Sequence, residues 1–354
     1  MKKHINLFNS ILLAAMVSLP ALSFAGDKDD IDKKKTISRT YNVTASDKLE
    51  IENSFGNVVI NTWDKNEIKV DVEIGVKASS EQKAQDIMDE IEVHDNQSGH
   101  TISFKTDVGE INNHGNKHKN NEDDDRKFDI DNRKFYIDYT VYMPAGNPLQ
   151  LENSFGKIKM PDFNGEVNLT SKFGGLTTGK LGNVDEIDVE FGTAEIGNIH
   201  NGEITFKFNS KSVIGVVSGS VKIKSEFSGN VQFAVADNIE ELSVFESYST
   251  IKMNVTKNLS ANFDVHTSFG SFRNSTGYAI AEDKEDDDDN GPKFDKSYSG
   301  KAGGGKAKIK IKSSFGNVRL SDSGDKTSVN NNDGDDDDDD KSEKHHSKKV
   351  KVSA

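Results

Sequence analysis

Apolar and polar residues alternate along most of the chain, in short runs that end at an aromatic residue. Before Phe155, for example, Leu149 and Leu151 stand six and four positions back, and polar residues separate them. A second alternating run follows, with Ile158 and Met160 three and five positions beyond the ring. Alternation with a period of two predicts β-strands with one buried face.

This unit recurs through the chain. Glu-Asn-Ser-Phe-Gly occurs at 52–56 and at 152–156, and Ser-Phe-Gly returns at 268–270 and 314–316. From Phe155 to Phe269 the aromatic positions step by 18, 18, 17, 19, 21 and 21 residues. Such intervals suit one turn of a repeat protein, here called a coil, and are too short for a domain. The aromatic residues of the coils are Phe55, Phe155, Phe173, Phe191, Phe208, Phe227, Tyr248, Phe269 and Phe315.

The phase of the alternation predicts where each side chain of a coil points. The aromatic residue is in phase with the apolar set, so we expect it to face inward and to form the core of the repeat. The residue two before it is also in phase and is small and polar, which predicts an internal ladder along the stack. Its members would be Asn53, Asn153, Ser171, Ser225, Thr267 and Ser313, with breaks at Val189, Phe206 and Glu246. The glycine after the ring suits a corner with positive φ.

Strand, corner, strand and turn predict an all-β fold, a single-stranded parallel β-helix (β-solenoid) over residues 149–320. An acidic, Gly-rich insertion near 281–306 separates the last motif from its predecessor. A β-sandwich is the main alternative, because it also has short strands and regular turns. It does not predict a recurring aromatic residue. The handedness of the helix does not follow from the pattern.

Residues 36–148 differ from the coils. Strands there are joined by a short amphipathic helix at 79–93, with Ser79 and Gln82 as a capping box, and by an acidic loop near 107–127. We expect this β-rich portion to cover the open end of the stack, because a solenoid end exposes unpaired strand edges.

Composition and charge indicate where the protein works. Residues 1–25 have two lysines, an apolar stretch and small residues before a cleavage point between Ala25 and Gly26, which predicts a signal peptide. Residues 26–35 would be a flexible N-terminus and 321–354 a disordered tail, acidic and then basic. The chain has no cysteine and a net charge of −14, concentrated in acidic low-complexity runs. We therefore expect a bacterial protein that is exported to the periplasm, cell surface or medium, with no transmembrane segment after signal removal.

The segment Asn57 to Asp64, the segment Tyr139 to Gly146 and the repeated Phe-Gly-x-apolar coils together resemble the bacterial "putative adhesin" family of exported domains of unknown function. The resemblance covers most of residues 40–320. It implies a right-handed single-stranded β-helix and a role in adhesion. It supplies no catalytic residues.

Candidate chemistry is sparse. The acidic run Asp286, Asp287, Asp288 and Asp289 offers oxygen ligands for weak Ca²⁺ binding but lacks the spacing of an EF-hand, so solvated charge is the favoured interpretation. His114 and His118 lie in a Gly/Asn-rich stretch that argues against a metal site. Trp63 suits packing under the N-terminal portion better than stacking on a sugar. We expect no cofactor and no nucleic-acid partner, since the basic end at 348–351 is short and the chain is acidic.

The sequence thus predicts a non-enzymatic, monomeric binding or adhesion scaffold whose partner is an unknown surface protein or polysaccharide. Two alternatives stay open, a carbohydrate-active enzyme on a β-helix and an accessory protein for envelope sensing or signalling. The nearly minimal coils between 149 and 260 leave little room for the loops that frame a catalytic groove.

Overall fold

The computed structural model describes residues 30–109, 135–283 and 294–323. Within these ranges the protein is all-β, with 23 strands joined in one mixed sheet and one helix. The prediction of an all-β protein with one short helix is therefore confirmed.

The strands of the first third are β1 (Ile31–Asn42), β2 (Lys48–Ser54), β3 (Val58–Thr62), β4 (Glu67–Ala78), β5 (Glu92–Ser98), β6 (Thr101–Asp107) and β7 (Phe135–Met143). The middle contains β8 (Leu149–Ser154), β9 (Lys157–Met160), β10 (Phe163–Lys172), β11 (Gly175–Thr178), β12 (Leu181–Glu190), β13 (Thr193–Ile196), β14 (Ile199–Lys207), β15 (Lys211–Glu226), β16 (Asn230–Ser247) and β17 (Thr250–Val255). The last strands are β18 (Ala261–Ser268), β19 (Ser271–Asn274), β20 (Ala279–Glu282), β21 (Asp295–Ala302), β22 (Ala307–Ser314) and β23 (Asn317–Asp322).

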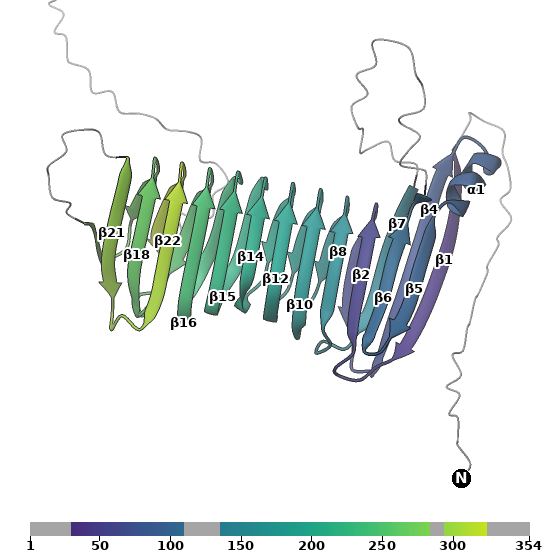
Figure 1. The fold of residues 1–354 in the computed structure, drawn as a ribbon, viewed down its shortest axis with the longest axis horizontal. Coiled ribbons are helices and arrows are strands. Elements are labelled where there is room, and N and C mark those ends of the chain that lie inside the picture. Colours follow the sequence, from purple (N-terminus) through teal and green to yellow (C-terminus); the bar gives the residue numbers. More distant parts are fainter. Residues whose placement is uncertain (1–29, 110–134, 284–293, 324–354) are drawn as a thin grey trace, which may run out of the picture. The chain divides into compact units, whose positions relative to one another are not determined.

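In the middle of the chain each coil pairs in parallel with the coil before it and the coil after it. Ser171 of β10 pairs with Asn153 of β8 on one side and with Val189 of β12 on the other. The short strands after the corners pair in the same way, β9 with β11 and β11 with β13. Figure 1 shows the strands before the corners standing side by side from β8 to β16. Sequence neighbours are thus spatial neighbours here.

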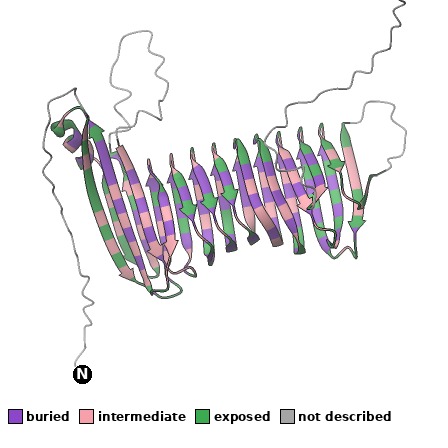
Figure 2. Ribbon diagram, turned by 180° about the vertical axis from the view of Figure 1, so that it is seen from behind, coloured by how far each residue is buried: buried purple, intermediate pink, exposed green. Residues whose placement is uncertain are grey.

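The apolar positions of the alternating runs form the core between these strands. Leu151, Ile158 and Ile223 are buried, while their neighbours on either side within each strand are intermediate or exposed. Figure 2 shows this alternation as successive buried and exposed bands along each strand. A further buried row lies at the start of the longer strands, where Phe163 pairs with Leu181 and Leu181 with Ile199. The period-two assignment of these strands is correct.

The first third joins the middle through two parallel pairings, β2 with β8 and β3 with β9. Beyond β3 the sheet continues through β7, β4 and β1, and β4 pairs antiparallel with both neighbours. Beyond β2 it continues through β6 and the antiparallel β5. Much of the predicted acidic loop at 107–127 falls outside the described residues.

The helix α1 (Glu81–Asp89) packs its buried residues Ala84 and Met88 toward β4 and β1. Its N-terminal cap is Ser80, whose hydroxyl accepts a hydrogen bond from the backbone N–H of Lys83 at 3.3 Å. The predicted capping box on Ser79 and Gln82 is therefore wrong by one residue. The described part of the chain contains no helix that is long and apolar enough to cross a membrane.

At the C-terminal end the spatial order departs from the chain order. The last coil, β22 and β23, lies between β16 and β17 on one side and β18 and β19 on the other (Figure 1). Part of the predicted insertion at 281–306 forms β21, which pairs antiparallel with β18 and with β20. The final repeat is thus inserted between two earlier segments, which nothing in the repeat pattern indicated.

Candidate binding surface

The aromatic residues of the coils lie on the outside of the protein, so the prediction that they face inward is wrong. Phe55 and Phe155 are half-buried, and the rings of the later coils are between 44% and 54% exposed. The exposed rings are Phe173, Phe191, Phe208, Phe227, Tyr248, Phe269, Phe294 and Phe315. Phe294, just before β21, was not predicted to belong to this set.

These ten aromatic side chains stack on one another in a single row, here called the ring column. Neighbouring ring centroids are 4.7–5.4 Å apart and the ring planes are inclined by 1–16°. The order in space is Phe55, Phe155, Phe173, Phe191, Phe208, Phe227, Tyr248, Phe315, Phe269 and Phe294. Because the faces of the rings cover each other, the column presents ring edges to the solvent.

The backbone conformation of each ring residue explains why the phase argument failed. From Phe55 to Phe315 the nine aromatic corner residues all have a positive φ, between 49° and 68°. A residue in this left-handed region ends the alternation of a strand, so its side chain leaves the inward set. The region favours Gly, Asn and Asp, and a phenylalanine gives no hint of it. Its cost of about 1–2 kcal/mol is comparable to the roughly 0.5–1.5 kcal/mol of an aromatic pair.

Where a glycine follows the ring, it has a different role from the one predicted. Gly156, Gly174 and Gly192 are not among the residues with positive φ. A Cβ on Gly174 would lie 1.8 Å from the carbonyl oxygen of Gly156, and one on Gly192 would lie 2.1 Å from that of Gly174. At these corners the glycines therefore let adjacent coils approach more closely than a Cβ would allow. The coils of Phe208, Phe227 and Tyr248 have Asn209, Ser228 and Ser249 at this position instead.

The polar residues two positions before the rings face inward, as predicted. All six of them are buried. Asn53 donates a hydrogen bond from its side-chain amide to Oδ1 of Asn153 at 2.9 Å, and Asn153 donates to the carbonyl oxygen of Gly56 at 3.0 Å. Among the described residues the hydroxyls of Ser171 and Thr267 have no partner, so the ladder is discontinuous.

A carboxylic acid takes the ladder position in one coil. Glu246 is buried and accepts a hydrogen bond from the backbone N–H of Ser249 at 2.5 Å and one from the hydroxyl of Ser313. Burial raises the pKa of Glu246 above its ordinary value, although these two hydrogen bonds oppose the shift. Because Ser313 belongs to the inserted β22, this side chain links the coil of β16 to its neighbour in space.

The ring column has a charged flank formed by the residue immediately before each of the nine corner rings from Phe55 to Phe315. In spatial order these residues are Ser54, Ser154, Lys172, Glu190, Lys207, Glu226, Ser247, Ser314 and Ser268. The four charges alternate in sign along the middle of the column. Lys207 binds Glu190 of the preceding coil at 3.3 Å, and this hydrogen bond raises the pKa of Lys207.

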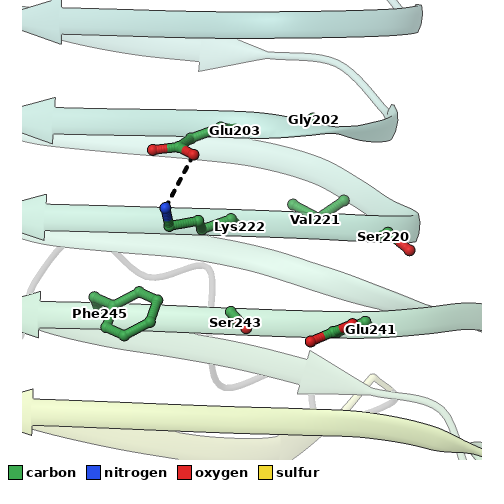
Figure 3. A pocket seen from close by; sticks show the side chains of 8 residues that line it. All are labelled: Gly202, Glu203, Ser220, Val221, Lys222, Glu241, Ser243 and Phe245. Carbon is green, nitrogen blue, oxygen red and sulfur yellow. Dashed lines mark hydrogen bonds and ion pairs between the residues drawn. The ribbon is translucent and has the colours of Figure 1, made fainter.

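The outer face of β14, β15 and β16 carries a shallow hollow of about 360 Å³ (Figure 3). Glu203 accepts a hydrogen bond from Lys222 at 3.0 Å and pairs with Lys224 at 2.5 Å, and the hydrogen bond from Lys224 lowers its pKa. The Lys222 ammonium also lies 5.9 Å from the ring centre of Phe245. Two lysines thus pair with one carboxylate in the hollow, and its lining also includes Glu241.

Trp63, Asp188 and the candidate metal ligands concern the sequence-based hypotheses of sugar stacking, catalysis and metal binding. Trp63 stacks on Tyr142 with centroids 5.5 Å apart, and its indole N–H donates to the carbonyl oxygen of Glu67 at 2.7 Å. On the outward face of β12, burial and then the nearby Glu190 raise the pKa of Asp188. Within the described ranges no group of three or more His, Asp or Glu residues could hold a metal ion.

The remaining predicted sites fall outside the described residues. These are the cleavage point at Ala25 and Gly26, the histidines His114 and His118, and the acidic run Asp286–Asp289. They stay predictions. So does weak calcium binding.

Comparison with known proteins gives structural neighbours only. No family model matches the chain, and no curated protein matches it. Among solved structures, a putative cell adhesion protein from Clostridium sporogenes aligns with 82% of this chain and 100% of its own, at 10% identity and a TM-score of 0.25. A putative adhesin from Bacteroides fragilis aligns with 81% of this chain and 97% of its own, at 13% identity and a TM-score of 0.29.

A putative lipid binding protein from Parabacteroides distasonis aligns with 80% of this chain and 96% of its own, at 12% identity and a TM-score of 0.28. The descriptions of the first two neighbours refer to adhesion, and that of the third refers to lipid binding.

Proposed function

We propose that the protein is a non-enzymatic binding scaffold of the bacterial cell envelope, exported after cleavage at Ala25, and that it binds its partner through the ring column. The observation that carries the proposal is the continuous row of exposed, stacked rings from Phe173 to Phe294. Each exposed ring contributes on the order of 100 Å², half the area of a buried aromatic side chain. Eight of them amount to roughly 800 Å², more than the largest apolar patch of a typical monomer.

The fold we propose for the scaffold is a single-stranded parallel β-solenoid, right-handed as the family resemblance implies, with residues 36–148 closing its first end. Parallel pairing of successive coils from β8 to β16 supports this assignment. A solenoid suits adhesion because stacking converts one exposed residue per coil into a long, straight stripe.

The geometry of the rings favours a protein partner over a polysaccharide. Sugar recognition by aromatic residues uses the flat face of a ring, and here each face inside the column is covered by the next ring about 5 Å away. Ring edges and their aliphatic surroundings suit the apolar surface of another protein. The hollow near Glu203 gives the enzymatic alternative no specific support, because Glu203 is paired with Lys222 and Lys224.

A binding assay with ring variants tests the proposal. Fluorescently labelled protein from residue 26 onward would be added to cells of the producing bacterium, and the retained fraction measured. The variant combines Phe191→Asn, Phe208→Asn and Phe227→Asn, because asparagine tolerates positive φ and keeps the corner. We expect retention to fall at least tenfold.

The matched control is Phe245→Thr, which removes an outward ring on β16 that lies outside the column. It should leave retention unchanged. Equal retention of the triple variant and the natural protein, with both folded by circular dichroism, would refute binding through the ring column.

A further inference from the structure

The ring column offers enough surface for a stable protein contact. If six of its exposed rings were covered, on the order of 600 Å² of apolar surface would be buried on one side. The flanking polar residues would bring the total near the roughly 800 Å² per partner of an ordinary specific interface. A partner must therefore present a surface whose shape and charges match the evenly spaced rings of the column.

The order of charges along the charged flank indicates which surface this is. Read along the column, the middle of the flank runs Ser154, Lys172, Glu190, Lys207, Glu226 and Ser247. Read in the opposite direction, each lysine is replaced by a glutamate and each glutamate by a lysine, while serine meets serine. A surface that inverts its charges on reversal is complementary to a reversed copy of itself.

We propose that the occupant of the ring column is a second copy of this chain, packed with its own column antiparallel to the first. This proposal rests on the function proposed above and names the partner. A two-fold axis would cross the column midway between Phe191 and Phe208, perpendicular to it and in the plane of contact. The charged flanks of the two copies then lie on the same side and run in opposite directions.

This arrangement makes four ion pairs across the contact. Lys172 faces Glu226 of the partner subunit and Glu190 faces Lys207 of the partner subunit, and the symmetry repeats both pairs. The pitch also matches, because both columns have the same ring spacing of about 5 Å. Phe191, on one side of the axis, would face Phe208 of the partner subunit near the centre of the interface, and the symmetry repeats this contact.

A parallel arrangement lacks this complementarity. A two-fold axis along the column would bring the charged flank against the opposite flank, formed by the first residues after the corner. Next to the central rings these are Gly175, Thr193, Lys211 and Asn230. These residues include no acid to pair with Lys172 or Lys207. Lys211 would lie opposite the middle of the charged flank, which contains both lysines and glutamates. The antiparallel copy is the arrangement that uses all four charges.

The next outward row along the strands agrees with the antiparallel copy. It is acidic at one end, with Glu52 on β2, and basic at the other, with Lys312 on β22. The same axis sets Glu52 opposite Lys312 of the partner subunit. Two positions further from the rings Glu186 would face the partner's Glu203, a like-charge pair at the rim that solvent screens.

Charge reversal tests the pairing in solution. We expect the protein from residue 26 onward to dimerise in sedimentation equilibrium. Lys172→Glu alone and Glu226→Lys alone each set like charges face to face twice, and each should raise the dimer dissociation constant at least tenfold. The double variant restores both pairs and should recover the original constant within about threefold. Within one copy the two residues are three coils apart, so recovery cannot come from a contact inside the chain.

The control is Lys159→Glu, an exposed lysine on β9 away from the charged flank, which should leave the dissociation constant unchanged. Thermal unfolding of all variants would confirm that they remain folded. Failure of the double variant to recover dimerisation, or a natural protein that stays monomeric at 100 μM, would overturn the proposal.

Cross-linking gives the register directly, because the chain has no cysteine of its own. The variants Lys172→Cys and Glu226→Cys would be mixed in equal amounts and oxidised. The mixed disulfide should form at least five times more than either homodimer. Predominant Lys172→Cys homodimer would contradict the register.

These outcomes separate the inference from the function on which it rests. If the triple ring variant loses cell binding while charge reversal changes neither binding nor mass, the ring column binds a different protein and the antiparallel copy is wrong. If the triple ring variant binds cells normally and the charge variants still show recovery, the column is a dimer contact and the proposed adhesion surface is wrong.

Discussion

Two columns of side chains run along the same corner of the stack, one inside and one outside. The inner one holds the small polar residues, such as Asn153 and Ser171, and the outer one holds the rings, such as Phe155 and Phe173. They are two residues apart in the sequence and in phase by simple alternation. The ring residue itself has a positive φ, which turns its side chain outward, so the period-two pattern is valid only up to the corner.

The sharpest test of this comparison uses two phenylalanines of one coil. Phe206 occupies the inner position and is fully buried, whereas Phe208 belongs to the ring column. Phe206→Ala should lower the free energy of unfolding by about 3–5 kcal/mol, because it empties part of a packed core. Denaturant unfolding followed by circular dichroism measures this. A loss below about 1 kcal/mol would show that the core does not enclose this ring.

The corner glycines should come next in magnitude. Gly174→Ala places a methyl group 1.8 Å from the carbonyl oxygen of Gly156, so the two coils must separate. We expect a loss of about 1–3 kcal/mol in unfolding free energy. The control is Gly277→Ala, where an added Cβ meets nothing within 4 Å. Similar stabilities of the two variants would contradict close approach as the reason for glycine.

Phe208→Ala should have a smaller effect than either. The ring loses two stacking contacts but little burial, so we expect a loss of about 1–2 kcal/mol, with the stacking contribution of each pair near 0.5–1.5 kcal/mol. The same unfolding experiment measures it beside Phe206→Ala. A loss as large as that of Phe206→Ala would show that the Phe208 ring is packed in the core and would contradict its place in the ring column.

Glu246 should produce the smallest effect, visible as a pH dependence. Its pKa in the folded protein is raised above the ordinary value of 4.5. Folding therefore favours the protonated form, and stability declines as pH rises from about 4.5 through the folded pKa. Glu246→Gln copies the protonated side chain, since its amide accepts from Ser249 and donates to Ser313. The variant should lack this decline, which unfolding curves between pH 4 and pH 8 would reveal.

The identity of the inner row could be predicted from the sequence, but the outer row could not. Leu149, Leu151 and Asn153 are correctly placed by alternation because a strand imposes that period on every residue within it. Phe155 is misplaced because its backbone is left-handed, with a φ of 60°, as in the other corner residues. No propensity of phenylalanine signals this conformation.

The charged flank shows the same division. Lys172 and Glu190 each precede an aromatic residue in the sequence, yet their alternation with Lys207 and Glu226 has meaning only once the coils are stacked in register. The pairing of strands brings residues 17 to 19 positions apart into one row. A candidate site built from such a row is invisible in any short stretch of sequence.

The sequence by itself determined the strands, the repeat and the inward apolar and polar positions, because these depend on a local period. Tertiary structure alone decided which way the rings point and where the last coil lies. The motifs at Phe269 and Phe315 are the same tripeptide, so local pattern cannot order them. Pairing of β22 with both β16 and β18 orders them, and that choice depends on contacts between residues far apart in the chain.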